Sequence, residues 1–328
     1  MTMVASLNDP YTKFLDPKEF ADETNSIKGS LKGIGIQIGV KDGKLMVIAP
    51  IEDTPAEKAG LLADDEILEI DGASTKGITV DKAADKIRGK EGTQVTLLVK
   101  RKDAPPKTYT ITRAEIEIKS ISQKIPDKIN MPDDFCYIRL SSFISRNAAS
   151  EFGSILNNSK NKKGFIIDLR SNPGGLLTIA IYISDMFLDG GTIVSTVDRD
   201  GYKETQRASS GVYTKKPVVV LINKGSASAS EIFSGAMKDN HRAVIIGEQS
   251  FGKGLVQEIN KLPYEAGINI TIQKYLTPNG TDINKKGITP DIEVKLTEED
   301  IKNKNDVQLQ KAIEVLSKMT NGQSLAVQ

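Results

Sequence analysis

Between residues 136 and 247, short apolar runs alternate with stretches of helical periodicity, and this alternation constrains the fold more than any other feature of the chain. The runs have the length of strands and are bounded by turn-forming residues; they are residues 136–140, 164–169, 218–222 and 243–247. Helices are predicted between them, over residues 147–157, 177–188 and 231–238. Strands that alternate with helices form a mostly parallel sheet covered by helices, so the sequence predicts an α/β core.

The residues before this core have a different pattern. Short alternating runs predict β-strands over residues 34–40, 45–48, 66–70 and 95–99. One helical turn is expected over residues 55–60 and an amphipathic helix over 80–88. We interpret this part as a compact β-rich module, residues 1–30 as a small helical segment and residues 113–133 as a polar connection. A last amphipathic helix is predicted over residues 307–319.

Composition excludes several classes of function. The 44 Lys and Arg nearly balance the 43 Asp and Glu, so no net field attracts nucleic acid or an acidic membrane. Cys136 is the single cysteine and His241 the single histidine, which leaves no internal disulfide and no usual zinc ligand set, and we expect neither a metal nor a cofactor. No apolar run reaches the roughly 20 residues of a membrane span, and the N-terminus has no signal-peptide pattern. Either the protein is cytosolic or its targeting segment lies outside this chain.

Three turns after predicted core strands carry unusual residues, and ligands bind at this end of the strands in open α/β sheets. The turns are Ser-Asn-Pro-Gly-Gly at 171–175, Lys-Gly-Ser-Ala-Ser-Ala-Ser at 224–230 and Glu-Gln-Ser-Phe-Gly-Lys-Gly at 248–254. A serine held at a helix N-terminus beside free backbone amides has the geometry of a nucleophile elbow. The alternative is that Ser226, Ser228 and Ser230 only cap the helix, and a partner base has to decide.

Lys253 is the candidate base. It lies between two glycines that allow close approach of the backbone, and burial can lower the pKa of a lysine enough to leave it neutral.

His241 follows a polar stretch and is interpreted as part of the solvated end of a helix rather than as a catalytic base. Residues 247–253 also fit the first seven positions of a phosphate-binding loop, but Gly254 replaces the required hydroxyl residue and a strand pattern follows, which disfavours an NTPase.

Several motifs together resemble the carboxyl-terminal processing proteases of the S41 peptidase family, in the family's order and over nearly the whole chain. They are residues 9–12, 168–175, 224–232, 247–248, 251–254 with Gln257, 275–280 and 287–291. The resemblance implies an α/β serine protease core with a parallel-rich sheet, crotonase- or ClpP-like, over residues 114–298. It also implies a PDZ domain over 31–113, an N-terminal helical segment over 1–30 and a C-terminal helical tail over 299–328.

The family's Ser-Lys pair, assisted by a glutamine, corresponds to Ser228, Lys253 and Gln257, so the resemblance selects Ser228 over the other two serines. Along a strand Lys253 and Gln257 would lie about 13 Å apart, so their contact requires a bend or bulge, which Gly252 and Gly254 can provide. The family's oxyanion hole uses backbone amides, and the matching N–H groups belong to Ala229 and Gly174, with Gly175 as the alternative.

PDZ domains bind a peptide C-terminus as an added strand. The matching loop is Gly33-Ile34-Gly35-Ile36, and an apolar pocket for the last side chain is expected from Ile36, Ile38, Val80, Ala84 and Ile87. These aliphatic residues are otherwise simply the core of the module. Arg88 either links peptide occupancy to the protease core or is a surface charge that complements the helix dipole.

The resemblance implies an ATP-independent serine endopeptidase that cuts protein substrates near their C-termini, with recruitment or gating by the PDZ domain. Its partners are proteins or peptides with apolar C-termini and not nucleic acids; a homodimer and an activating partner protein both fit the family. The family works outside the cytoplasm, so we expect a periplasmic or cell-surface protein whose signal or anchor is absent from this chain. The alternative is an inactive PDZ scaffold, which the joint presence of Ser228, Lys253 and Gln257 disfavours.

Overall fold

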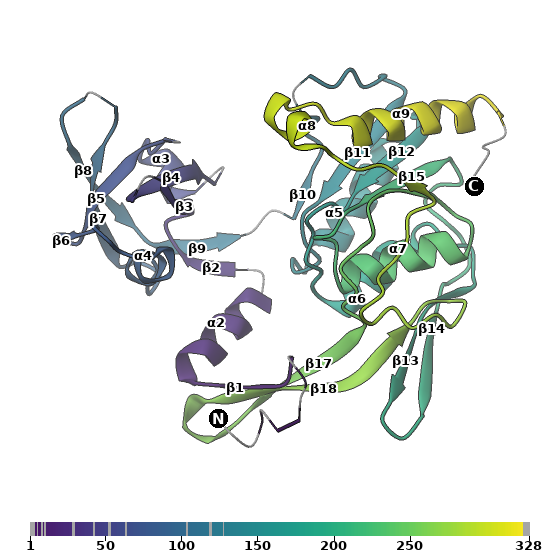
Figure 1. Cartoon of the computed structure of the whole chain (residues 1–328), viewed down its shortest axis with the longest axis horizontal. Coiled ribbons are helices and arrows are strands. Elements are labelled where there is room, and N and C mark those ends of the chain that lie inside the picture. The colour runs from purple at the N-terminus through teal and green to yellow at the C-terminus, as the bar shows by residue number, and fades with distance from the viewer. Residues whose placement is uncertain are drawn as a thin grey trace. The chain divides into compact units, whose positions relative to one another are not determined.

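The computed structural model describes residues 4, 6–7, 9, 11–27, 30–41, 43–51, 54–62, 64–102, 104–117, 120–126 and 128–323. The chain divides into two compact units, residues 29–118 and residues 1–28 with 119–328 (Figure 1). The predicted N-terminal segment (1–30) and C-terminal tail (299–328) lie in part outside the described residues, namely at 1–3, 5, 8, 10, 28–29 and 324–328. No helix of the described residues is long and apolar enough to cross a membrane, and no group of three or more metal-ligating side chains occurs among them.

The larger unit is built on a six-stranded sheet in the order β10-β11-β12-β15-β16-β19. The strands are β10 (Ile121–Ser122), β11 (Phe135–Leu140), β12 (Gly164–Asp168), β15 (Val218–Ile222), β16 (Val244–Gly247) and β19 (Ile292–Glu293). All neighbouring pairs are parallel except β10 with β11. Every residue of β12 and of β15 is buried, as expected for central strands covered on both faces. The predicted α/β core is therefore confirmed.

Helices cover both faces of this sheet. The helices are α5 (Ala148–Asn158), α6 (Leu177–Asp185), α7 (Ala229–Asp239), α8 (Glu298–Asn303) and α9 (Val307–Thr320). Side chains of α5, α6 and α7 form one apolar cluster with alternate residues of β12 and β15, such as Ile167 and Val220. The other residues, such as Ile166 and Val219, pack against α9. The segment predicted as a helical tail thus contains the helix that covers the second face of the sheet.

A second, antiparallel sheet of five strands belongs to the same unit, and β17 pairs with β18 beside the order β1-β18-β13-β14. The strands are β1 (Lys13–Leu15), β13 (Thr192–Asp198), β14 (Lys203–Arg207), β17 (Leu255–Lys261) and β18 (Gly267–Leu276). The short helix η1 (Pro263–Glu265) joins β17 to β18. We predicted a helical N-terminal segment, and this prediction is wrong in part. β1 precedes α2 (Pro17–Ile27) and runs along β18 (Figure 1).

The smaller unit is β-rich. Its sheet has the order β3-β4-β5-β7-β8, with β6 paired to β5, and a second pair joins β2 and β9. The elements are β2 (Ser30–Gly33), β3 (Ile36–Lys41), β4 (Lys44–Pro50), α3 (Pro55–Lys58), β5 (Glu66–Ile70), β6 (Ala73–Ser74), α4 (Val80–Ile87), β7 (Gln94–Lys100), β8 (Lys107–Thr112) and β9 (Ala114–Glu117). The predicted polar connection over 113–133 is wrong in part, since it contains β9 and also β10, the edge strand of the core sheet.

Candidate active site

The serine-rich turn joins the buried strand β15 to helix α7. Ser228 is the N-cap of α7 and has φ 54° and ψ −115°, a strained conformation for a residue with a side chain. The other two serines are committed to the fold: the hydroxyl of Ser226 donates to the carbonyl of Leu169 at 2.8 Å, and that of Ser230 to the carbonyl of Asn172 at 3.0 Å. Both are fully buried, whereas Ser228 is half-buried. The turn therefore presents Ser228 differently from its two neighbours.

One buried carboxylate joins this turn to the lysine loop. Glu231 is 1% exposed, and its Oε2 accepts the backbone N–H of Ser228 at 2.8 Å and that of Lys253 at 2.9 Å. Its Oε1 accepts the N–H of Gly252 at 2.7 Å and the hydroxyl of Ser250 at 2.6 Å. The backbones of Ser228 and Lys253 are thus both bound by a single side chain. Sequence reasoning missed Glu231, although the Ser-x-x-Glu spacing of a capping box was visible.

Lys253 is half-buried in the loop that precedes β17. Burial lowers the pKa of Lys253, the carboxylate of Glu23 opposes this shift, and the ammonium of Lys13 adds to it. The Nζ of Lys253 lies 5.2 Å from the centroid of the Tyr11 ring. Within the part of the chain that the structure describes, no hydrogen bond joins Lys253 Nζ to Ser228 Oγ. The loop and the turn are joined by Glu231 and by the backbone N–H of Phe251, which donates to the carbonyl of Ser226 at 3.0 Å.

Gln257 lies on β17 close to an irregularity in the strand pairing. Val256 is opposite Gln273 and Gln257 is opposite Thr271, so Ile272 of β18 is an extra residue at this point. The Nε2 of Gln257 lies 3.5 Å from the hydroxyl of Thr271, a long hydrogen bond. The expected irregularity is present, but the bulge is on β18 rather than at the two glycines beside Lys253. No hydrogen bond between Gln257 and Lys253 occurs among the described residues.

The Asn-Pro-Gly-Gly turn lies directly against the serine turn. Gly174 has φ +100°, and a Cβ built there would lie 2.7 Å from the carbonyl oxygen of Ala227, 2.8 Å from Ser228 Cβ and 3.0 Å from the nitrogen of Ala229. Only glycine permits this conformation and this approach. The two predicted oxyanion-hole residues, Gly174 and Ala229, are therefore neighbours.

Asn172 holds the turn in this place and was also missed by sequence reasoning. It is fully buried, its Nδ2 donates to the carbonyl of Leu140 at 2.7 Å, and its own carbonyl accepts the N–H of Ala227 at 3.0 Å. Its Oδ1 accepts the N–H of Gly174 at 2.9 Å. One of the two predicted oxyanion donors is consequently engaged within the protein.

Tyr275 of β18 contacts the same site and had no predicted role beyond its place in a motif. Burial raises the pKa of Tyr275 to about 12, and a hydrogen bond with the side chain of Ser228 acts in the opposite direction. The backbone N–H of Tyr275 donates to the carbonyl of Gly254 at 2.8 Å. Tyr275 thus contacts both the serine turn and the lysine loop.

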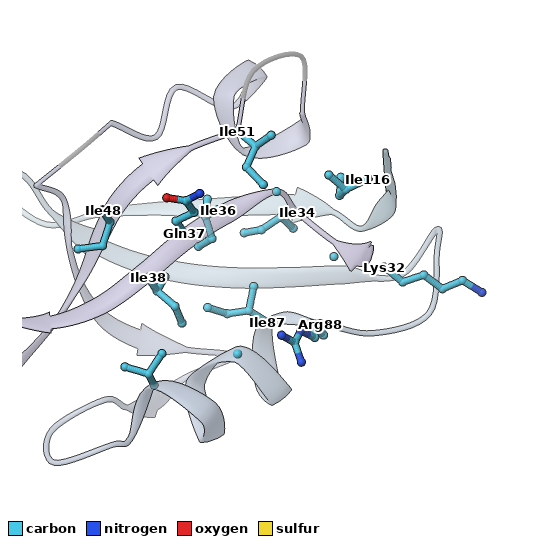
Figure 2. Close-up of a pocket in the computed structure, with 14 residues that line it drawn as sticks. Lys32, Ile34, Ile36, Gln37, Ile38, Ile48, Ile51, Ile87, Arg88 and Ile116 are labelled. Carbon is cyan, nitrogen blue, oxygen red and sulfur yellow. The ribbon is translucent and has the colours of Figure 1, made fainter. Parts of the chain in front are cut away.

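The smaller unit contains an apolar pocket of about 450 Å³ between β3 and α4 (Figure 2). All the predicted peptide-binding residues line it: Gly33, Ile34, Gly35, Ile36, Ile38, Val80, Ala84 and Ile87. Arg88, predicted as a switch or a surface charge, also lines it. Sequence reasoning missed the others, which are Lys32, Gln37, Ile48, Ile51 and Ile116. Ile34 and Ile87 are buried and also belong to the core of the unit, so part of the pocket wall is core, and peptide binding there stays a prediction.

Comparison with known proteins identifies the family. The model of peptidase family S41 matches residues 134–294, and that of the PDZ domain matches residues 46–101. A carboxyl-terminal-processing protease of Synechocystis sp. is 40% identical over 323 residues, which cover 96% of this chain and 75% of the relative. The chain belongs to peptidase family S41. A second carboxyl-terminal-processing protease, from Picosynechococcus sp., is 44% identical over 295 residues, which are 88% of this S41 peptidase and 70% of the relative.

Solved structures agree with this assignment of the S41 peptidase. A photosystem II D1 C-terminal processing protease superimposes with a TM-score of 0.59 at 31% identity and covers 96% of this chain and 84% of its own. The protein is therefore a serine-type peptidase with a PDZ domain, and it acts on proteins or peptides. The serine turn and the lysine loop both lie within residues 134–294, whereas the PDZ match begins after the loop at Gly33.

Proposed function

We propose that this S41 peptidase is an endopeptidase in which Ser228 attacks the scissile carbonyl and Lys253 is the general base. The observation that carries the proposal is the junction at Glu231, which binds the backbone N–H groups of both residues. Neutral Lys253 accepts the proton of the Ser228 hydroxyl as the tetrahedral intermediate forms, and then protonates the leaving amine. Water hydrolyses the resulting ester of Ser228 in the second half of the reaction. The lowered pKa of Lys253 supports this role.

Gln257 is proposed to orient the lysine. Its amide lies on β17 beside Thr271, next to the bulge at Ile272. In the proposed catalytic arrangement, this amide lies within reach of the Lys253 amine. Gln257 then contributes a hydrogen bond that fixes the direction of the lysine side chain.

The proposed oxyanion hole consists of the N–H groups of Ala229 and Gly174. Ala229 is the first residue of α7, where backbone N–H groups point out of the helix and its dipole favours negative charge. The N–H of Gly174 serves as the second donor once it shares or leaves Asn172 Oδ1. Gly175 is the alternative donor on the same turn.

The test is cleavage of an unfolded protein with an apolar C-terminus, without ATP and with a chelator present. Ser228→Ala and Lys253→Ala are each expected to lower kcat/KM by at least about 1,000-fold, because the nucleophile and its base act as a unit. His241→Asn is the control, because His241 is exposed and has φ 53°, a backbone angle that asparagine tolerates. This variant should cleave the substrate like wild type. If wild type binds the substrate but does not cut it, the protein is an inactive scaffold or a latent protease that requires a partner.

The PDZ domain is proposed to bind the last residues of the substrate. β3 is the edge strand of its sheet and offers unpaired backbone groups beside the pocket. The apolar lining favours an aliphatic C-terminal side chain, and the exposed cations Lys32 and Arg88 at one end of the pocket attract the terminal carboxylate (Figure 2). We propose that this binding recruits substrate to the protease and gates it; the role of Arg88 as the link stays a prediction.

Ile38→Glu is expected to weaken binding of a peptide with an apolar C-terminus at least tenfold, because it buries an unpaired carboxylate in the pocket. Fluorescence anisotropy of a labelled peptide measures the change. Leu62→Glu is the matched control, since Leu62 is 51% exposed and lies outside the pocket. Equal affinity in Ile38→Glu and Leu62→Glu would show that the peptide binds elsewhere.

The location and assembly of the protein are proposed on the family resemblance. We propose an extracytoplasmic protein, periplasmic or at the cell surface. A homodimer and an activating partner protein are further predictions, which the oligomeric state in solution and a pull-down from the native membrane fraction would test.

A further inference from the structure

The N-terminal segment reaches the lysine loop through a defined anchor. Lys13 of β1 pairs with Asn269 of β18. Just before this strand, the hydroxyl of Thr12 accepts the backbone N–H of Thr271 at 3.1 Å and donates to the carboxylate of Asp9 at 2.5 Å. The same carboxylate accepts the N–H of Tyr11 at 3.1 Å. Tyr11 is therefore held in a fixed turn on β18, the strand that also pairs with β17 after Lys253.

The Tyr11 ring lies over the amine of Lys253. The distance of 5.2 Å from Nζ to the ring centroid is within the range of direct contact between an amine and an aromatic face. Lys253 is half-buried, and the ring covers part of the amine that water would otherwise reach. The chemical steps proposed above make no use of Tyr11, so this contact calls for a role of its own.

An aromatic ring has two opposite effects on a lysine. Exclusion of water favours the neutral amine, whereas the electron-rich face favours the ammonium ion. The charged groups that face Lys253 are Glu23 of α2 and Lys13 of β1, which pair with each other at 3.0 Å and have opposite effects on the pKa of the amine. Burial is the largest influence on the amine and lowers its pKa, and the Tyr11 ring is one of the groups that cover it.

We propose that Tyr11 is a positioning residue for the catalytic base: its ring keeps water from the Lys253 amine and so keeps the lysine neutral. The proposal rests on Lys253 being the base, as proposed above. It makes the N-terminal segment part of the active site, although this segment lies far from the serine turn in the sequence.

The test is kcat/KM as a function of pH, from about pH 6 to about pH 10, for four variants of the full chain. Tyr11→Phe and Tyr11→Leu keep an apolar cover and should keep the wild-type midpoint. Tyr11→Ala admits water, so the midpoint of the acidic limb should rise by about one pH unit, which lowers activity near neutral pH about tenfold and leaves it unchanged at high pH. Phe14→Ala is the control, because Phe14 lies on β1 with a 43% exposed side chain, and its midpoint should not move.

Three results would overturn the proposal: an unchanged midpoint in Tyr11→Ala, a lower midpoint in Tyr11→Leu, or an equal shift in Phe14→Ala. The second would mean that the ring stabilises the ammonium ion, and the third that docking of the segment matters rather than the ring. Tyr11→Val uncovers the amine only in part and should shift the midpoint in the same direction by less, which keeps the test available if the alanine variant does not fold.

Lys253→Ala is measured beside these variants. If it retains activity, the proposed base is wrong. If it is inactive while Tyr11→Ala has the wild-type profile, only the role of Tyr11 is wrong.

Discussion

Replacing Glu231 by alanine is expected to lower kcat/KM by at least about 100-fold, because the nucleophile and the base lose the side chain that fixes their relative positions. The carboxylate binds the backbone N–H groups of Ser228, Gly252 and Lys253 and the hydroxyl of Ser250. Displacements of about 1 Å are enough for losses of this size. Peptide binding by the PDZ domain should not change, since Glu231 lies in the other compact unit.

Glutamine is not a conservative replacement at this position. Each carboxylate oxygen of Glu231 accepts two hydrogen bonds, so an amide would place its NH₂ group against two donors. Glu231→Gln should therefore also lose most of the activity. Both variants leave buried donors without an acceptor, at a cost of about 1–3 kcal/mol for each such group.

The control is Glu258→Ala, because Glu258 is an exposed glutamate on β17, close to the lysine loop in the sequence. It should have wild-type kcat/KM and wild-type stability. Activity of Glu231→Ala within threefold of wild type, measured on folded protein, would mean that the serine turn and the lysine loop keep their geometry without this carboxylate.

Replacing Arg170 by leucine is expected to destabilise the core by about 3–5 kcal/mol, because it leaves a buried carboxylate without its main partner. Arg170 Nη2 donates to Asp168 at 2.7 Å, and its two terminal nitrogens bind the carboxylate of Asp306 at 2.7 and 2.8 Å. Asp306 is the N-cap of α9. Arg170 thus ties the end of β12 to the helix that covers the second face of the sheet. Thermal unfolding should begin about 10 °C lower.

The loss should depend on pH. Burial raises the pKa of Asp168, but the guanidinium groups of Arg170 and Arg139 outweigh it and hold this pKa below its usual value. In wild type, this contribution to stability is present above the unfolded-state pKa and is lost as the pH falls through the folded-state pKa. In Arg170→Leu burial has less opposition, so the pKa of Asp168 rises. The deficit relative to wild type should be full above about pH 5 and shrink toward pH 3.

Arg199→Leu is the matched control, since Arg199 is 91% exposed and forms a surface ion pair with Asp200. Its stability should stay within about 0.5 kcal/mol of wild type. An equal unfolding temperature for Arg170→Leu and wild type would show that the buried network does not hold α9 in place. A deficit that is the same at pH 3 and pH 7 would show that the ionisation of Asp168 does not determine it.

The parts of the fold that could be predicted from sequence are those with local patterns. The run Val218–Ile222 is long and apolar enough to be a central strand, and it is one. β1 was missed because its three residues show no alternation and its partner β18 lies at the far end of the chain. α9 was predicted as an amphipathic helix. The surface that it covers depends on the order of the strands in the sheet, and the periodicity of a sequence carries no information about this order.

The same division applies to the active site. Ser228, Lys253 and Gly174 lie on turns that the strand pattern and the motifs marked. The spacing of Ser228 and Glu231 suggests a local helix cap, yet three of the four donors to Glu231 come from residues 250–253, in a different turn. Tyr11 reaches Lys253 through strand pairing, and nothing in its local sequence indicates this contact.

The central claim, that Ser228 carries the acyl group with Lys253 as its base, is tested most directly by trapping the acyl-enzyme. An activated peptide ester is mixed with the enzyme, the reaction is quenched with acid within milliseconds, and the acylated residue is identified by mass spectrometry. We predict an acyl group on Ser228 in wild type, at least about 100-fold slower acylation in Lys253→Ala, and none in Ser228→Ala. An acyl group on Ser226 or Ser230, or turnover by Ser228→Ala at the wild-type rate, would contradict the claim.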